Sequence, residues 1–181
     1  MQATSQRKRT LPSSTVVIVC LIFSLGFIFL VHAAHSAQPE KAVTDSSGKI
    51  IQVTKPFQRI ISLYSAHTEN ICSLGADKQL IGISRSDDYP SSITTLKRYS
   101  YREDPEKFIA AQPDLVLVRP MIERSYPEFI KKLRQAGISV LSLQPNGVDD
   151  MFSYWRNLGV LTGREVQAEE MITAFQSTIT K

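Results

Sequence analysis

The feature that most constrains the fold is a regular alternation of short apolar runs and amphipathic segments that begins after Pro56. The apolar runs, at residues 59–63, 79–84, 114–118 and 138–143, have the length and composition of buried strands. Between them, residues 66–74, 104–111 and 125–136 show helical periodicity, and glycines at 75 and 137 follow two of these helices. Residues 85–103 are polar and aromatic and are expected to form a loop. Because closely alternating strands and helices form parallel βαβ units, the sequence predicts an α/β fold with a parallel sheet over residues 57–148.

The carboxyl-terminal segment, residues 149–181, is predicted to be helical. Asp149 and Asp150 are expected to cap a first helix that runs to about residue 161. The sequence Thr162-Gly163-Arg164-Glu165 has the form of a capping box and predicts the start of a second helix. That helix has one apolar stripe, made by Ala168, Met171, Ile172, Phe175 and Ile179. The stripe still continues where the sequence stops at Lys181, so we expect it to be poorly covered.

The first 37 residues have the pattern of a secretory signal peptide. A basic Arg7-Lys8-Arg9 cluster precedes an apolar run over residues 15–31, and small residues follow it. An uncleaved signal anchor is the alternative, because the apolar run approaches the length of a membrane span. Cys20 lies inside this run, which leaves Cys72 as the single cysteine of the exported part. An exported chain without a disulfide fits a bacterial periplasm.

The remaining amino-terminal part, residues 38–56, is predicted to be a polar lead-in and a small hairpin. Its turn is expected at residues 45–48, with a return strand over residues 49–53.

From Gln38 onward there are 18 Lys and Arg residues against 17 Asp and Glu residues, a net charge of +1. This balance gives no support for a nucleic-acid partner. The phosphate-binding and nucleophile-elbow glycine motifs are also absent from the sequence, so no enzymatic activity is predicted.

Candidate binding residues follow the predicted strands, where the carboxyl edge of a parallel sheet collects ligands. They are Tyr64, Ser65, His67, Arg85, Tyr89, Arg119 and Arg124. Ser65 is expected to cap the next helix, and His67, in its first turn, to be neutral near pH 7. The arginines suit carboxylates and the tyrosines suit flat ligands, whereas the alternative is a set of solvated surface residues. No cofactor or metal site is predicted, because one histidine does not supply the three or four ligands that a metal needs.

The chain resembles the periplasmic substrate-binding proteins of ABC importers for iron-siderophore and cobalamin ligands, the class with a long backbone helix. The similar segments include "RIISLYSAHTENICSLGA", "DDYP", "DPEKFIAAQPDLVLV" and "LGVLTGREVQAEEM", from about residue 43 to 181. The resemblance implies a Rossmann-like amino-terminal lobe of a bilobal protein, followed by the start of the interlobe helix. It also implies a metal-chelate or corrinoid ligand and an inner-membrane ABC permease as partners.

Glu106 has two interpretations. Asp104-Pro105-Glu106 is a good helix start, with an Asp cap and Pro at the first helical position. The resemblance adds a second role, in which Glu106 docks onto basic residues of the permease. The leading hypothesis is therefore a periplasmic binding component of an importer. The alternatives are an exported or anchored ligand-sensing module and a non-functional amino-terminal fragment of such a protein.

Overall fold

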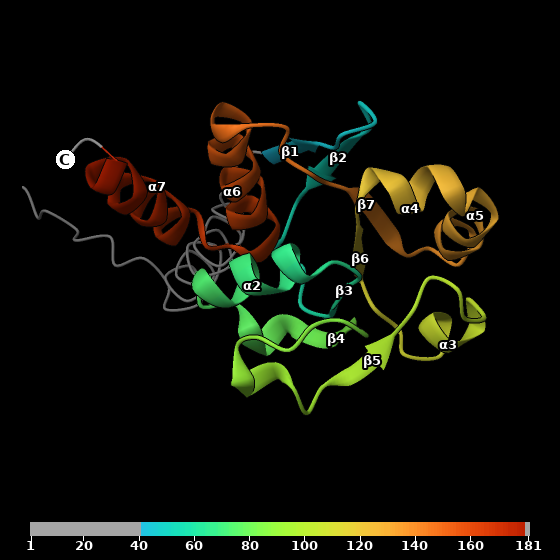
Figure 1. Ribbon diagram of the computed structural model, residues 1–181. Helices are drawn as coiled ribbons and strands as arrows, with labels where there is room; N and C mark the ends of the chain where they lie inside the picture. The colour runs from blue at the N-terminus through green and yellow to red at the C-terminus, as the bar shows by residue number, and fades with distance from the viewer. Residues whose placement is uncertain (1–40, 180–181) are drawn as a thin grey trace, which may run out of the picture. The chain divides into compact units, whose positions relative to one another are not determined.

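The structure is a computed structural model that describes residues 41–179 (Figure 1). Its main sheet has five parallel strands in the order β5-β4-β3-β6-β7. The strands are β3 (Ile60–Ser62), β4 (Leu80–Ser84), β5 (Lys97–Tyr99), β6 (Leu115–Val118) and β7 (Ser139–Ser142). All four strands predicted from the apolar runs are present and pair in parallel, as expected. The α/β fold class is confirmed.

Strand β5 was not expected, because residues 85–103 were predicted to be a loop. It contains only Lys97, Arg98 and Tyr99, of which the first two are exposed and the third is buried. It pairs with β4 alone and forms one edge of the sheet. An edge strand needs no continuous apolar run, because one of its sides faces solvent.

Helices cover both faces of the sheet, because alternate residues of each strand point to opposite sides. Ile60, Leu115 and Leu117 face α2 (Ser65–Ser73) and α6 (Val148–Thr162). Ile61 and Val116, with their alternate neighbours, face α3 (Glu106–Ile109), α4 (Pro120–Ser125) and α5 (Pro127–Gln135). Figure 1 shows the two helical layers on either side of the strands.

The region between β6 and β7 holds two helices where one was predicted. The sequence indicated a single helix over residues 125–136. The structure starts α4 at Pro120, which occupies the first helical position, and interrupts the helix at Tyr126. The interruption follows from Pro127, which lacks the N–H group that a continuous helix would need and restricts the residue before it.

The predicted hairpin is confirmed: β1 (Lys41–Thr44) and β2 (Ile50–Val53) pair antiparallel. Asp45 organises the turn, since its carboxylate accepts the backbone N–H groups of Ser47 and Lys49, both at 2.9 Å. The hairpin joins the main domain through the Ser46 N–H, which donates to the Ser142 carbonyl at 2.8 Å. Val43 and Val53 lie in the core between the sheet and α6.

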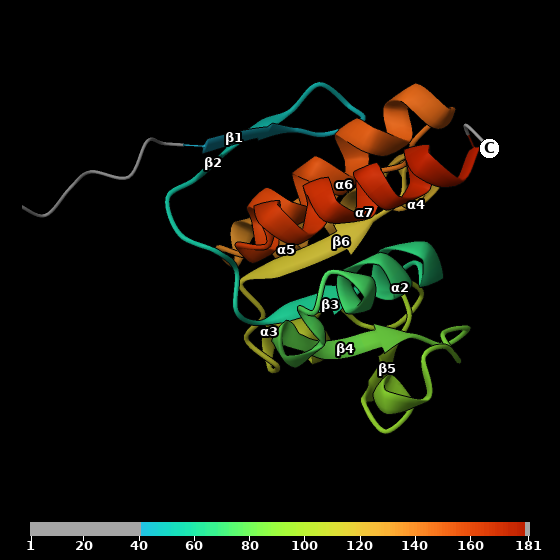
Figure 2. The ribbon, with the colours of Figure 1, turned by 90° about the vertical axis from the view of Figure 1, so that its left-hand side faces the viewer.

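The carboxyl-terminal part forms two packed helices, α6 and α7 (Glu165–Ile179), as predicted (Figure 2). The expected capping box is wrong. Thr162 is the last residue of α6, and its hydroxyl donates to the Leu158 carbonyl at 2.7 Å. Gly163 ends α6 in the left-handed conformation that glycine adopts at low cost, with φ 68°. The predicted caps of α6, Asp149 and Asp150, lie inside its first turn.

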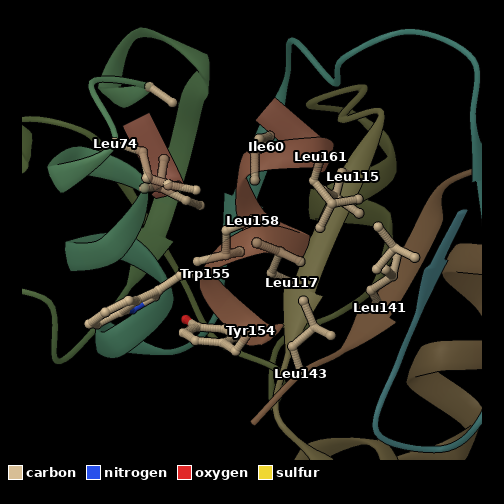
Figure 3. Packing of buried hydrophobic residues seen from close by; sticks show 14 of the residues in the cluster. Ile60, Leu74, Leu115, Leu117, Leu141, Leu143, Tyr154, Trp155, Leu158 and Leu161 are labelled. Atoms are coloured by element: carbon tan, nitrogen blue, oxygen red, sulfur yellow. The ribbon is translucent and has the colours of Figure 1, made fainter. Parts of the chain in front are cut away.

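The apolar stripe of α7 is better covered than expected over its first half. Ala168 and Ile172 are buried, and the Phe175 ring lies 5.7 Å from Trp155 and 6.0 Å from Phe152. Leu158 and Leu161, on the same helix as Trp155, pack in turn on Ile60, Leu115 and Leu117 of the sheet (Figure 3). Only Ile179, which is 62% exposed, fulfils the expectation of an uncovered apolar side chain at the end of the helix.

Candidate functional site

A hollow of about 310 Å³ opens at the carboxyl edge of the sheet, where β3, β4, β5 and β6 end. We call it the edge hollow. Its lining has three arginines (Arg85, Arg102 and Arg119), three tyrosines (Tyr64, Tyr99 and Tyr101), four serines (Ser65, Ser84, Ser86 and Ser100), Leu63 and Ile122. The edge hollow therefore contains the predicted residues Tyr64, Ser65, Arg85 and Arg119. This position agrees with the general location of ligands in open α/β sheets.

The arginines of the edge hollow differ in their partners. Arg85 forms an ion pair with Glu103, whose side chain is 16% exposed, and the hydrogen bond from Arg85 lowers the pKa of the Glu103 carboxyl. Arg119 lies over the Tyr64 ring at 5.2 Å, and Arg102 lies over the Tyr101 ring at 5.4 Å. No carboxylate among residues 41–179 pairs with Arg102 or Arg119. These two guanidinium groups are therefore available to an anion.

Arg102 was missed by sequence reasoning. Its place depends on β5, because Ser100, Tyr101 and Arg102 directly follow that strand. The arginine also donates from Nε to the Tyr126 hydroxyl at 3.3 Å, and the Tyr126 and Tyr101 rings are 4.7 Å apart. The sequence gives only a weak signal for this strand, because Lys97 and Arg98 are both charged and Tyr99 is its single apolar residue. Recognition of that strand would have placed residues 100–102 at the edge.

Ser65 lines the edge hollow, but its expected role as a helix cap is wrong. The residue that precedes α2 is Tyr64, and no side chain caps the helix. The Ser65 hydroxyl instead donates to Asp87 Oδ1 at 2.7 Å. Asp87 is 1% exposed and also accepts from the Thr68 hydroxyl at 2.5 Å and from the Ser84 backbone N–H at 3.1 Å. The Ser65 hydroxyl proton thus goes to a buried, charged acceptor, and Ser65, as the first residue of α2, is not at the position from which a side chain caps the helix.

Residues 60–181 match the model of a family described as periplasmic binding protein. The chain belongs to this family. The matched region contains the whole five-stranded sheet and both carboxyl-terminal helices. The family consists of substrate-binding transport proteins.

Individual relatives agree with this assignment. A Bacillus subtilis (strain 168) protein, described as an uncharacterized ABC transporter substrate-binding lipoprotein, YvrC, is 25% identical over 139 residues, which cover 76% of this chain and 44% of the relative. The crystal structure of a possible iron-binding (periplasmic solute-binding) protein from Staphylococcus epidermidis ATCC 12228 matches with TM-score 0.63 and 30% identity over 68% of this chain and 49% of that one. The crystal structure of the periplasmic vitamin B12 binding protein BtuF of Vibrio cholerae matches with TM-score 0.59 and 25% identity, over 69% of this chain and 49% of that one. The chain thus spans about half the length of the relatives it matches.

His67, predicted to face a ligand, is fully buried. Its Nδ1 lies 2.7 Å from the Tyr154 hydroxyl and its Nε2 lies 3.1 Å from the Val118 carbonyl oxygen. Burial lowers the pKa of His67 to about 4, so the ring is neutral near pH 7 as expected, although the cause is desolvation. The prediction that His67 contacts a ligand is wrong for this structure, because both ring nitrogens are bonded within the protein and no part of the side chain is accessible.

Two other predicted residues lie outside the lining of the edge hollow. Tyr89 is 67% exposed in the loop after β4, and Arg124 is exposed in the last turn of α4.

The lone cysteine of the described part, Cys72, is half-buried, and burial raises the pKa of its thiol to about 11. A thiol with a raised pKa is a poor nucleophile near pH 7, because little of it is ionised.

Glu106 begins α3 and is exposed. Its backbone N–H donates to Asp104 Oδ1 at 3.1 Å, so the carboxylate bonds the first N–H group of the helix as expected. The residue that directly precedes α3 is, however, Pro105, which was predicted to be the first helical residue. The Glu103 carboxylate, which pairs with Arg85 at the edge, also lies 3.8 Å from Nζ of Lys107 in α3. This places the start of α3 near the carboxyl edge of the sheet. The Glu106 side chain has no hydrogen-bond or ion-pair partner among residues 41–179.

The remaining predictions concern metal binding and the amino terminus. Among the described residues, no group of three or more His, Cys, Asp or Glu side chains is arranged to hold a metal ion. Within residues 41–179, no helix has both the length and the apolar character of a membrane span. The predicted signal segment, residues 1–37, lies outside the described part of the chain.

Proposed function

We propose that this chain is the amino-terminal, ligand-binding lobe of the substrate-binding component of an ABC importer. It takes up an iron chelate of the siderophore type, or a cobalamin, outside the cytoplasm and presents it to a membrane permease. No covalent chemistry is assigned to it. The observation that carries this proposal is the edge hollow, in which Arg102 and Arg119 lie on tyrosine rings and have no carboxylate partner among residues 41–179.

The chemistry of the edge hollow favours an anionic chelate within this ligand class. A guanidinium group pairs with a carboxylate through two parallel hydrogen bonds, and an aromatic ring beneath it holds its plane. Two such groups in the lining of one hollow match a ligand that carries several carboxylates. The iron-related name of the Staphylococcus relative supports the same choice, whereas the Vibrio relative supports a corrinoid.

The size of the edge hollow indicates that it is one wall of a larger site. Pockets for small molecules usually enclose 300–1,000 Å³ and bury most of the ligand surface. At about 310 Å³ and open to solvent, the edge hollow lies at the lower limit. A chain with about half the length of its relatives is therefore expected to bind weakly on its own.

Export and docking complete the proposal. The Bacillus relative is described as a lipoprotein, which supports a location outside the cytoplasm for this chain too. Exposed Glu106, at the start of α3, is the residue assigned to contact with basic residues of the permease. Its position near the edge would point it at the membrane whenever the edge hollow faces the permease.

Isothermal titration calorimetry tests the proposal with ferric citrate as an anionic chelate and cyanocobalamin as a corrinoid. The full chain is used in a mild detergent, because residues 15–31 are apolar. We expect ferric citrate to bind with a dissociation constant above micromolar and Arg119→Gln to raise it about 10-fold, because a hydrogen bond to a charged group contributes about 1.5–3 kcal/mol.

The matched control is Arg156→Gln, which removes an exposed arginine of α6 that pairs with Glu169 at 2.6 Å. This control should leave the affinity unchanged. Micromolar or tighter binding by the monomer would show that the edge hollow suffices for ligand binding without a second lobe. Equal affinities of Arg119→Gln and the unmodified chain for ferric citrate would refute the anion-binding role of Arg119.

A further inference from the structure

The buried His67 has a defined tautomer, because of the groups around it. The Val118 carbonyl, 3.1 Å from Nε2, can only accept a hydrogen bond, so Nε2 carries the proton. Nδ1 is then an acceptor, and the Tyr154 hydroxyl donates to it at 2.7 Å. The same hydroxyl lies farther from the Ala66 carbonyl, at 3.4 Å. His67 of α2 therefore bonds β6 on one side and α6 on the other.

The bond to Val118 ends close to the edge hollow, whereas the bond to Tyr154 ends on α6, outside its lining. Val118 is the residue directly before Arg119, so the bond from His67 holds the peptide from which the arginine side chain extends. The Tyr64 ring meets the His67 ring edge-on at 5.2 Å, and the Arg119 guanidinium lies on the same Tyr64 ring at 5.2 Å. His67 thus lies directly behind the two residues that form one wall of the edge hollow.

We propose that His67 is a positioning residue for this wall: it fixes Arg119 and Tyr64 at the edge hollow and connects them, through Tyr154, to α6. The part of the proposal that concerns ligand affinity rests on the proposed function. An apolar side chain would fill the same space without a directional bond to either neighbour. Burial keeps the imidazole neutral near pH 7, because it lowers the pKa to about 4, and so preserves the tautomer that donates to Val118.

The experiment compares His67→Gln with His67→Asn. The Gln amide nitrogen reaches about as far as Nε2 and keeps a donor for the Val118 carbonyl, whereas the shorter Asn amide reaches only as far as Nδ1. Each variant keeps one of the two bonds, and both should lower the melting temperature. The first readout is the NMR signal of the Arg119 Nε–H group without ligand, which the Tyr64 ring displaces from its solvent position.

We expect His67→Gln to leave the Arg119 signal in place and His67→Asn to move it toward the position of a solvated arginine. The second readout is the affinity for ferric citrate by calorimetry on the full chain, which His67→Asn should reduce about 5-fold to 10-fold. Lower melting temperatures in both variants, with the Arg119 signal unmoved in both, would show that His67 only stabilises the fold and would overturn the proposal.

The two readouts separate this inference from the proposed function. Movement of the Arg119 signal in His67→Asn, without any binding of ferric citrate by the unmodified chain, would uphold the positioning role and reject the anionic ligand. The nitrogen shifts of the His67 ring in the unmodified chain add a test that needs no variant. A proton on Nδ1 instead of Nε2 would also overturn the proposal, because the bond to Val118 would then be absent.

Discussion

Acidification should destabilise this chain through His67, and the structure gives the size and direction of the effect. The imidazole is fully buried between α2, β6 and α6, and desolvation is the largest cause of its lowered pKa. The bond to the Val118 carbonyl and the charge of Asp87 act in the opposite direction but do not compensate. In the unfolded chain the same ring titrates near its ordinary pKa of 6.5.

The sign follows from proton uptake. Between pH 6.5 and about 4 the unfolded chain holds a proton on His67 that the native chain lacks, so acid favours unfolding. The contribution of His67 to stability is fully present above pH 6.5 and is lost as the pH falls toward 4. At pH 4.5 the loss amounts to about 2.5 kcal/mol, since one pH unit corresponds to 1.36 kcal/mol.

The assay is urea unfolding followed by circular dichroism at pH 7, 6, 5 and 4.5, for the unmodified chain and for His67→Gln. Carboxylates titrate in both proteins, so their contribution cancels in the difference between the two free energies of unfolding. We expect this difference to change by about 2.5 kcal/mol in favour of the Gln variant between pH 7 and 4.5. A difference that stays constant across this range would refute the placement of a neutral, buried His67.

Three further predictions concern docking and helix packing. Glu106→Lys should reduce uptake by the reconstituted importer about 10-fold through charge repulsion and leave ferric citrate affinity unchanged; equal losses of both would indicate a structural role. Gly159→Ala should lower the free energy of unfolding by about 1–3 kcal/mol, because the new Cβ would lie 2.9 Å from Ala168 Cβ; a more stable variant in urea would contradict the close packing of α6 on α7. Phe175→Ala should cost about 1–3 kcal/mol and change the fluorescence of Trp155, whereas Ile179→Ala should stay within about 0.5 kcal/mol.

The strands that sequence reasoning found share one property: they are buried on both faces. Residues 115–118 are completely buried, and such strands appear as continuous apolar runs that local pattern analysis detects. β5 lacks that property, since Lys97 and Arg98 are exposed, and it was missed together with Arg102 beyond it. The error in the site therefore began as an error in an edge strand.

The misplacement of His67 has a different origin. A polar residue in the first turn of a helix is ordinarily solvated, and nothing in residues 59–76 indicates otherwise. Its burial depends on Val118 and Tyr154, which lie 51 and 87 positions later in the sequence. Only the assembled layers bring a carbonyl and a hydroxyl to the two ring nitrogens. Pairing of this kind has no local signature, so the sequence alone could not have revealed it.

Asp87 shows why the edge hollow has a defined shape in so short a chain. It belongs to the Asp-Asp-Tyr-Pro segment, yet its carboxylate is buried and accepts hydroxyl protons from Ser65 and Thr68 of α2 and from Ser84 of β4. Arg98 of β5 donates to the Asp87 carbonyl at 2.7 Å. A buried carboxylate is stable only when its oxygens are saturated in this way, so the loop cannot move without breaking several charge-assisted bonds. The side of the edge hollow that Ser65 and Ser84 line is thus held by bonds within residues 65–98, and what a second lobe would add is enclosure of the ligand.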